Sequence, residues 1–353
     1  MNRPLFIRAA LDQVPAYHSA RELARTGIFL DANENPFGSV IPSLADVELS
    51  RYPDPNAQPV CNAYAQWLVV DAACVLATAG SNDAIDLCCR LSLGPNDCAV
   101  ILEPTFSLYR TVASWYAADI VQITLPAPFT LDVENLLQTS ASMAPKALFI
   151  CSPNNPTGNA HAPEHILALC RALPHTMIIL DEAYVEFSNV PSLATAVMDQ
   201  PNLVVLRTLS KAWGLAALRV GFMIAHPDTI AWARRMRRPY PVSGLSMALA
   251  ITGIAQAPRM QALVQQIISA REQLTHDVSQ LGCAPWPSQA NFVACGVRDV
   301  TKFCTTLRAA TDIVLRDCSH MPGMPANALR ISIGAPEHLA TVVAHLAEWQ
   351  KKL

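Results

Sequence analysis

Apolar runs and stretches with helical spacing alternate along the chain between about residues 74 and 225. Short apolar runs bounded by turn residues are typical of buried strands, whereas apolar residues at every third or fourth position are typical of helices. Asp83–Leu93 is one such helix. The expected strands are Cys74–Thr78, Cys98–Leu102, Ile120–Leu125, Ala147–Cys151, Thr176–Leu180, Leu203–Leu206 and Val220–Ala225. This alternation predicts an α/β fold in which helices cover both faces of a mostly parallel or mixed sheet.

The pattern changes after residue 238. Pro239–Pro258 contains no charged residue, three prolines and too few large apolar side chains for a membrane span. We therefore expect a buried helix there that joins two domains. Beyond it, helices are expected at Gln261–Leu281 and Thr301–Ala310, and strands at Asn291–Cys295, Val314–Arg316 and Leu329–Ile333. The sequence thus predicts a large domain over residues 30–240 and a smaller α+β domain that includes residues 241–353.

The composition is that of a protein with a large core and few surface charges. Hydrophobic residues make up 52% of the chain and charged residues 15%, so a subunit interface can be buried in addition to the core. The net charge of −3 argues against nucleic acid as a main partner. The basic run Arg234–Arg238 is interpreted as a solvated helix end.

The cysteines and the N-terminal residues indicate the compartment. The eleven cysteines are scattered, without a Cys-x-x-Cys pair or the Cys/His spacing of a zinc site, so we expect reduced thiols and no metal. Met1–Phe6 lacks the apolar segment of a signal peptide. We therefore expect a soluble, cytoplasmic protein without a membrane partner.

One lysine stands out among the candidate reactive residues. The chain has five lysines against twenty arginines, and Lys211 lies in an apolar run shortly after the strand Leu203–Leu206, eight positions before Arg219. Desolvation favours the neutral amine, which is the form that attacks a carbonyl to give a Schiff base. The alternative is a lysine at the start of a helix whose stem is buried and whose amine reaches solvent.

Polar residues also follow three other expected strands. Asp181 comes directly after Thr176–Leu180, where a carboxylate can keep a pyridine nitrogen protonated; the alternative is a helix N-cap. Ser152–Gly158 follows another strand and also reads as an ordinary turn. Gly80–Asn82 lies between a strand and a helix, a place where backbone N–H groups can hold a phosphate. Since parallel strands deliver functional groups at their carboxyl ends, these groups are candidates for one site.

Together these segments resemble the pyridoxal-phosphate-dependent aminotransferases of fold type I, and more narrowly the histidinol-phosphate aminotransferases. The resemblance rests first on Ser152–Gly158, Asp181–Tyr184 and Thr208–Phe222. Further matching segments, in the expected order, are Val14–Arg21, Leu30–Pro36, Arg51–Asp54, Ala79–Asp83, Val314–Asp317 and Ala328–Gly334. The resemblance implies a large domain that holds the cofactor, and a small domain in which residues 1–29 pack with residues 241–353.

The resemblance also implies a role for each matching residue. Lys211 binds pyridoxal 5′-phosphate as a Schiff base and then moves a proton as general base and general acid. The implied contacts of the cofactor phosphate are Ser81, Asn82, Thr208, Ser210 and Arg219. The implied contacts of the ring are Phe106, which stacks on it, Asp181 at the nitrogen, and Asn155 and Tyr184 at the phenolic oxygen. Tyr52 is implied to reach the cofactor phosphate of a neighbouring subunit, which makes a homodimer part of the site.

Substrate selection depends on two arginines. In the wider family the residue that matches Arg330 holds an amino-acid carboxylate, which histidinol phosphate lacks. The narrower resemblance therefore assigns Arg330, Arg316 and Tyr17 to the substrate phosphate, with Asn33 beside them. It implies a ping-pong transamination of histidinol phosphate with 2-oxoglutarate, which yields imidazole acetol phosphate and glutamate in histidine biosynthesis.

Three alternatives keep the same cofactor residues. An aromatic or broad-range aminotransferase would place a carboxylate on Arg330, because arginine binds either a carboxylate or a phosphate bidentately. A phosphothreonine decarboxylase would release carbon dioxide instead of passing on an amino group. A regulatory protein that has lost catalysis is the third alternative, and the presence of Lys211, Asp181, Tyr184 and Arg219 argues against it.

Overall fold

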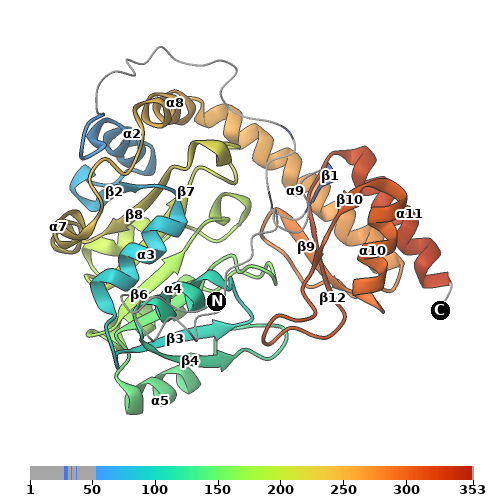
Figure 1. Ribbon diagram of the computed structural model, residues 1–353, viewed down its shortest axis with the longest axis horizontal. Coiled ribbons are helices and arrows are strands. Elements are labelled where there is room, and N and C mark those ends of the chain that lie inside the picture. Colours follow the sequence, from blue (N-terminus) through green and yellow to red (C-terminus); the bar gives the residue numbers. More distant parts are fainter. Residues whose placement is uncertain (1–27, 31–32, 34–36, 38–52, 352–353) are drawn as a thin grey trace, which may run out of the picture.

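The computed structural model describes residues 28–30, 33, 37 and 53–351. Its larger part is built on a seven-stranded sheet in the order β2-β8-β7-β6-β5-β3-β4 (Figure 1). β8 is antiparallel to both of its neighbours, and the other pairs are parallel, so the sheet is mixed as predicted. The strands are β2 (Val75–Thr78), β3 (Cys98–Glu103), β4 (Asp119–Thr124), β5 (Ala147–Cys151), β6 (Met177–Asp181), β7 (Leu203–Thr208) and β8 (Gly221–Ala225).

Helices cover both faces of this sheet, because side chains of each buried strand alternate between two apolar clusters. On β5, Leu148 and Ile150 belong to one cluster, and Phe149 and Cys151 belong to the other. The first cluster includes residues of α2 (Gln58–Leu68), α5 (Val133–Met143) and α6 (Pro163–Ala172). The second includes residues of α3 (Ser81–Ser92), α4 (Leu108–Trp115) and α7 (Pro227–Met236). The predicted α/β fold with two helical layers is confirmed.

The smaller part contains an antiparallel sheet in the order β11-β12-β9. Its strands are β9 (Phe292–Gly296), β11 (Arg316–Asp317) and β12 (Ala328–Ser332), and its helices are α10 (Val300–Thr311) and α11 (Pro336–Lys351). β1 (Ile28–Phe29) pairs in parallel with β10 (Ile313–Val314) beside this sheet.

The prediction of a single strand at Val314–Arg316 is wrong. Val314 ends β10 and pairs with Phe29, whereas Arg316 begins β11 and pairs with Arg330. At Leu315 the chain passes from β10, which pairs with β1, to β11, which pairs with β12. One predicted strand is therefore two short strands in two different sheets.

The chain between the two parts forms two helices, of which the second makes the crossing. α8 (Gly244–Ile254) packs beside α2 on the larger part, and α9 (Ala257–Gln280) runs from there to the smaller part (Figure 1). The expectation of a buried connecting helix is only partly right, because α8 is buried on one side and exposes Leu245 on the other. The long charged helix α9 makes the crossing instead. The domain boundary at residue 240 stays a prediction.

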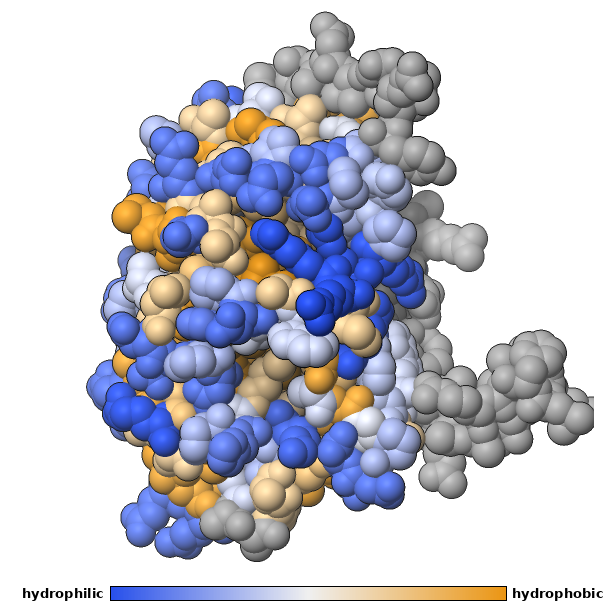
Figure 2. Space-filling model, turned by 90° about the vertical axis from the view of Figure 1, so that its left-hand side faces the viewer, coloured by the Kyte–Doolittle hydropathy of each residue, from blue (hydrophilic) through white to orange (hydrophobic). Residues whose placement is uncertain are grey.

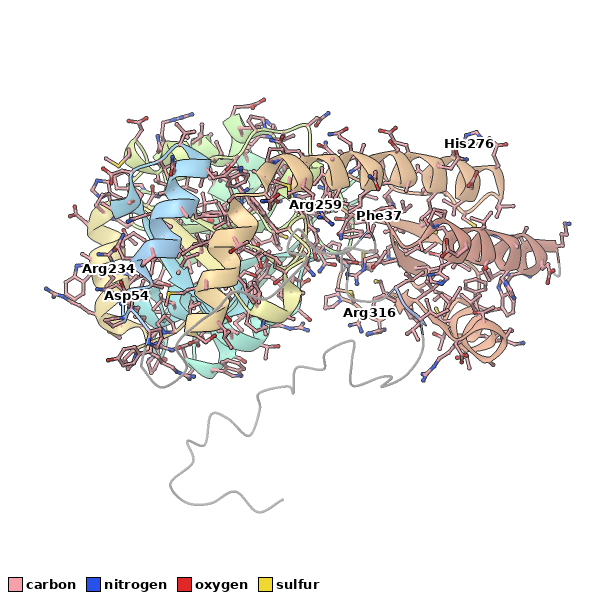
Figure 3. The ribbon with its side chains drawn as sticks, turned by 90° about the horizontal axis from the view of Figure 1, so that it is seen from above. Phe37, Asp54, Arg234, Arg259, His276 and Arg316 are labelled. Carbon is pink, nitrogen blue, oxygen red and sulfur yellow. The ribbon has the colours of Figure 1, made fainter. Side chains whose placement is uncertain are left out.

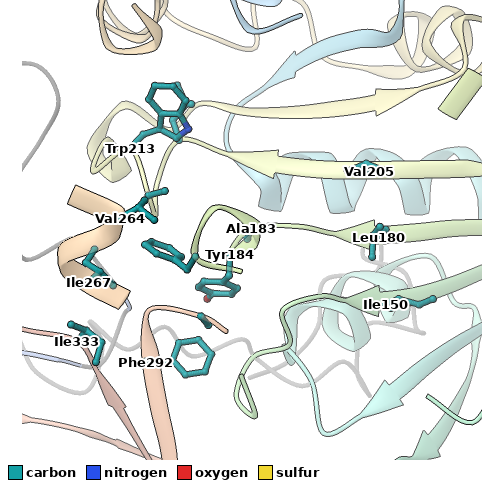
Figure 4. Packing of buried hydrophobic residues seen from close by; sticks show 14 of the residues in the cluster. Ile150, Leu180, Ala183, Tyr184, Val205, Trp213, Val264, Ile267, Phe292 and Ile333 are labelled. Carbon is teal, nitrogen blue, oxygen red and sulfur yellow. The ribbon is translucent and has the colours of Figure 1, made fainter. Parts of the chain in front are cut away.

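One apolar cluster continues from the larger part into the smaller one. Leu180 and Tyr184 of the larger part, Ile267 of α9, and Phe292 and Ile333 of the smaller part all belong to it (Figure 4). The rings of Tyr184 and Phe292 meet edge to face, with centroids 5.4 Å apart. Tyr184 therefore lies at the junction of the two parts.

Two further findings concern only the described residues. None of the helices formed by residues 53–351 is long and apolar enough to cross a membrane. All cysteines in this range are free thiols, most of them buried.

Candidate active site

The carboxyl ends of β5, β6 and β7 meet at one edge of the sheet. Asn155 follows β5, Asp181 ends β6 and Lys211 follows β7, and the three strands are direct neighbours. Neighbouring parallel strands end at the same edge, so the predicted residues come together. The positive charge of Lys211 acts on the Asp181 carboxyl group and favours its ionised form.

Asp181 is buried and held by two hydrogen bonds. The Tyr109 hydroxyl donates to its Oδ2 at 2.7 Å, and the Ala183 backbone N–H donates to its Oδ1 at 3.0 Å. Burial raises the pKa of Asp181, and the two donors and Lys211 lower it. Tyr184, and not Asp181, occupies the N-cap position of the short helix that follows, so the alternative role of Asp181 as a helix N-cap is wrong.

Lys211 lies in a turn rather than in a helix. Its backbone oxygen accepts a hydrogen bond from the N–H of Gly214, whose φ of +65° closes the turn. The side chain is half-buried, and its Nζ lies 5.7 Å from the ring centre of Tyr184. The alternative of a lysine at a helix start is therefore wrong. Trp213 lies within this turn and is fully buried, so it anchors the segment in the core.

The start of α3 and Arg219 form a cradle of hydrogen-bond donors. Gly80 precedes α3 with a φ of +85°, and a Cβ there would lie 2.4 Å from Nη2 of Arg219. Gly221 also lacks room for a side chain, since its Cβ would meet the backbone nitrogen of Ser81 at 2.5 Å. Arg219 Nη1 donates to Ser210 Oγ at 3.4 Å. The two glycines thus allow a guanidinium group and the N-terminal end of a helix to approach each other.

The other residues predicted for this cradle lie close by. The Thr208 hydroxyl accepts a hydrogen bond from the Ser210 backbone N–H at 3.1 Å. Ser81 and Asn82 form the first turn of α3, whose leading N–H groups have no partner within the helix. Asn82 and Arg219 are exposed, so the cradle opens to solvent. Unpaired donors and a positive charge at a helix start favour an anion such as phosphate.

Asn155 and Tyr184 are linked to the smaller part. Arg330 Nη1 of β12 donates to Asn155 Oδ1. Asn33 Nδ2 donates to the Tyr184 hydroxyl at 3.2 Å, and Ser332 Oγ donates to Asn33 Oδ1. Burial also raises the pKa of Tyr184, so that its hydroxyl stays protonated. Both parts of the chain therefore form the walls of the site.

Arg316 and Arg330 lie directly opposite each other on β11 and β12. Opposite residues of an antiparallel pair share one face of the sheet. Arg330 is buried, with its guanidinium carbon 5.2 Å from the ring centre of Phe292, and Arg316 is half-buried. Figure 3 shows Arg316 at the junction of the two parts. Two cations that face one another are stabilised by an anion between them.

Phe106 lies at the side of this site. Its ring meets the ring of Tyr109 edge to face, with centroids 5.7 Å apart. It is half-buried, as expected for an aromatic residue that offers one ring face to a ligand. Tyr17 and Tyr52 lie outside the described residues.

Three residues near the site are not among those predicted from the sequence, namely Tyr109, Glu182 and Arg207. The sequence signal for Tyr109 is its spacing of three positions from Phe106. Arg207 occurs inside a buried strand, directly after four apolar residues. A charged residue at a buried strand position indicates a partner, which is here Glu182.

Comparison with known families decides between the interpretations of this site. The family model of class I and II aminotransferases matches residues 25–346. The chain belongs to this family.

Within the aminotransferases, the related proteins point to one subgroup. The histidinol-phosphate aminotransferase of Cytophaga hutchinsonii is 34% identical over 301 residues, which cover 84% of this chain and 85% of that protein. Histidinol-phosphate aminotransferase 2 of Idiomarina loihiensis is 31% identical, with 97% of both chains covered. The resemblance inferred from the sequence motifs is thus confirmed.

A solved structure confirms the fold. The crystal structure of histidinol-phosphate aminotransferase from Sinorhizobium meliloti, in complex with pyridoxal-5′-phosphate, superimposes with a TM-score of 0.89. The identity is 24%, and 99% of both chains are covered. The aminotransferase chain described here therefore has the predicted fold of type I.

Proposed function

We propose that this aminotransferase transfers the amino group of histidinol phosphate to 2-oxoglutarate, with imidazole acetol phosphate and glutamate as products, in histidine biosynthesis. The observation that carries the proposal is the facing pair Arg316 and Arg330 next to Asn155. A phosphate dianion can accept hydrogen bonds from two guanidinium groups, whereas one arginine suffices for a carboxylate. The names of the related proteins support the same substrate.

The residues present fit pyridoxal phosphate as the cofactor. The cradle at Gly80 and Arg219 suits its phosphate, because a side chain at Gly80 would fill the space beside the guanidinium group. Asp181 offers a buried carboxylate for a ring nitrogen, and Phe106 offers an aromatic face. When bound, pyridoxal phosphate would supply an aldehyde for the substrate amine. Its ring would withdraw electrons from the substrate carbon that carries this amine.

Lys211 moves the proton in this proposal. Its Nζ would hold the aldehyde carbon of the cofactor and, once displaced by the substrate amine, would be free to act as base on the substrate carbon that carries the nitrogen. As acid, the same Nζ would return the proton to the cofactor carbon bonded to that nitrogen. The half-buried turn after β7 keeps Nζ next to Asp181 and Tyr184, so little motion is needed between these two steps.

The remaining residues bind and orient. Asn155 and Tyr184 are proposed to contact the phenolic oxygen of the cofactor, and Thr208, Ser210, Ser81 and Asn82 its phosphate. Asn33 connects Tyr184 to Ser332 of β12, so the walls of the substrate pocket are tied together across the two parts. Tyr17 is proposed to join the two arginines at the substrate phosphate.

We also propose a cytoplasmic homodimer without nucleic-acid or membrane partners. Exposed apolar side chains at the α7 and α8 side support an interface there, namely Trp232, Met236, Tyr240 and Leu245. Figure 2 shows apolar side chains between hydrophilic ones on the face that includes this side. In such a dimer, Tyr52 would reach the cofactor phosphate of the other subunit.

Separate titrations of the cofactor-loaded protein with histidinol phosphate and with phenylalanine, without an oxo acid, test this function. Conversion of the bound cofactor to its amine form is followed by absorbance. We expect half-conversion at a far lower concentration of histidinol phosphate than of phenylalanine. An equal or stronger response to phenylalanine would assign the protein to the aromatic aminotransferases. Release of carbon dioxide from phosphothreonine, without any oxo acid, would indicate the decarboxylase.

A further inference from the structure

Tyr109 contacts two of the residues that are proposed to hold the cofactor ring. Its side chain is almost completely buried at the start of α4. Its hydroxyl donates to Asp181 Oδ2 at 2.7 Å. Its ring meets Phe106 edge to face at 5.7 Å and stacks on Phe149 at 5.2 Å, with an interplanar angle of 18°. Tyr109 thus links Asp181, the proposed partner of the ring nitrogen, to Phe106, the residue proposed to stack on the ring.

The backbone explains how one side chain reaches both. Asp181 pairs with Cys151 in the parallel ladder of β5 and β6, so the two side chains lie on the same face. Phe149 lies two positions before Cys151 and therefore shares this face, which α3 and α4 cover. Phe106 and Tyr109 are three positions apart where α4 begins, a spacing that brings side chains together.

We propose that Tyr109 is a positioning residue that holds the Asp181 carboxylate and the Phe106 ring in a fixed relation, and thereby sets the protonation of the cofactor's ring nitrogen. This inference rests on the proposed function of the site. With Ala183 N–H on one oxygen and the Tyr109 hydroxyl on the other, the carboxylate has a single orientation. The remaining lone pairs then accept the N–H of a protonated pyridine ring.

The ionisable groups that face Asp181 come from several elements. Tyr109 lies on α4, Cys88 on α3, Cys151 on β5, Tyr184 after β6 and Lys211 after β7. Burial raises the pKa of both thiols and of both phenols, so these four groups stay neutral in the physiological range. The Tyr109 hydroxyl is therefore a neutral donor that favours the carboxylate over the carboxylic acid.

Removal of this hydroxyl has a defined chemical consequence. In Tyr109→Phe the stacking on Phe149 and the contact with Phe106 persist, but one oxygen of Asp181 loses its donor. The carboxylate then becomes more basic and takes a larger share of the proton between it and the ring nitrogen. A less protonated ring withdraws fewer electrons, so proton removal from the substrate slows while substrate binding does not change.

The experiment compares Tyr109→Phe with Tyr116→Phe. Tyr116 also donates a phenolic hydrogen bond to a carboxylate, Asp86 Oδ1 at 2.8 Å, but on the outer side of α3. We expect kcat to fall about tenfold to a hundredfold in Tyr109→Phe with KM for histidinol phosphate unchanged, the loss typical of a hydrogen bond to a charged group. We also expect the pH dependence of the bound cofactor's absorbance to shift. Tyr116→Phe should behave as the unmodified protein in both measurements.

A second measurement isolates the ring nitrogen. The apo-proteins are titrated with pyridoxal phosphate and with its 1-deaza analogue, in which carbon replaces this nitrogen. Tyr109→Phe should weaken the binding of pyridoxal phosphate by about fivefold or more and leave the binding of the analogue unchanged. Equal weakening of both ligands, or an unchanged kcat and absorbance profile, would overturn the inference. If the unmodified protein does not convert histidinol phosphate at all, the proposed function fails instead, and the affinity comparison still decides the role of Tyr109.

Discussion

Glu182 Oε2 accepts a hydrogen bond from Arg207 Nη1 at 3.1 Å, on the face of the sheet opposite to that of its sequence neighbour Asp181. Side chains alternate along a strand, so the two adjacent carboxylates serve different purposes. Asp181 faces Tyr109 and the site, whereas Glu182 faces Arg207 and the Ser192 hydroxyl in the interior. Arg207 also contacts Glu186 at 2.8 Å. This buried network fixes the segment that carries Asp181 and Tyr184.

Replacement of Glu182 by alanine should therefore reduce stability strongly. It leaves the buried guanidinium group of Arg207 with fewer negative partners, and loss of one member of a buried ion pair costs about 3–5 kcal/mol. The matched control is Asp228→Ala, which removes a carboxylate whose side chain is 91% exposed and costs at most about 1 kcal/mol. Urea unfolding followed by circular dichroism measures both. Similar midpoints for the two variants would show that the network contributes little.

Lys211→Ala should abolish transamination, with a loss of about a thousandfold or more, because Lys211 is the group proposed to move the proton. Lys302→Ala on the exposed side of α10 is the control and should keep full activity. Initial rates with histidinol phosphate and 2-oxoglutarate provide the measurement. A Lys211→Ala protein with near-normal turnover contradicts the assignment.

The central strands β5, β6 and β7 could be predicted because each contains a continuous apolar run that is buried on both faces. The residues at the ends of β5, β6 and β7 could be placed at one edge of the sheet, because parallel strands present their carboxyl ends at the same edge. Contacts between distant segments could not be predicted in this way. Asn33 and Tyr184 are 151 positions apart, and Tyr109 and Asp181 are 72 apart. Such pairs depend on how helices and strands pack, which local periodicity does not describe.

Gly80→Ala should weaken the binding of pyridoxal phosphate. The added Cβ would lie 2.4 Å from Arg219 Nη2, so the guanidinium group must leave the cradle. Gly282→Ala is a matched control, because Gly282 also has a positive φ, +75°, but nothing within 4 Å of the added carbon. Both variants carry backbone strain of order 1 kcal/mol, and only Gly80→Ala loses cofactor affinity, by about tenfold or more. Equilibrium dialysis gives both dissociation constants, and equal values would contradict the phosphate cradle.

Arg316→Gln should affect histidinol phosphate more than phenylalanine. The phosphate dianion is proposed to use both arginines, whereas a carboxylate is satisfied by Arg330. The loss of a charged hydrogen bond lowers kcat/KM for histidinol phosphate about tenfold to a hundredfold, with a much smaller change for phenylalanine. Arg308→Gln, on the exposed side of α10, is the control for removal of a positive charge. An equal loss with both substrates would mean that Arg316 does not recognise the phosphate.

His161 should make stability depend on pH below 6.5. It is buried in the segment that follows Asn155 and lines a small cavity with Ser152 and Glu182. Burial, assisted by the charge of His165, lowers its pKa to about 4, against about 6.5 in the unfolded chain. Between these values the unfolded chain binds a proton that the folded protein does not, so the free energy of unfolding decreases as the pH falls.

His161→Gln removes this contribution. Because a shift from 6.5 to about 4 corresponds to about 3 kcal/mol, the unmodified protein should lose about that much more stability than the variant between pH 6.5 and 4. Below pH 4 the folded protein also binds the proton, and the two curves run parallel. His276→Gln on the exposed side of α9 is the control and should follow the unmodified protein (Figure 3). Urea unfolding at each pH decides, and parallel curves throughout would show that His161 takes up its proton at the same pH in the folded protein as in the unfolded chain.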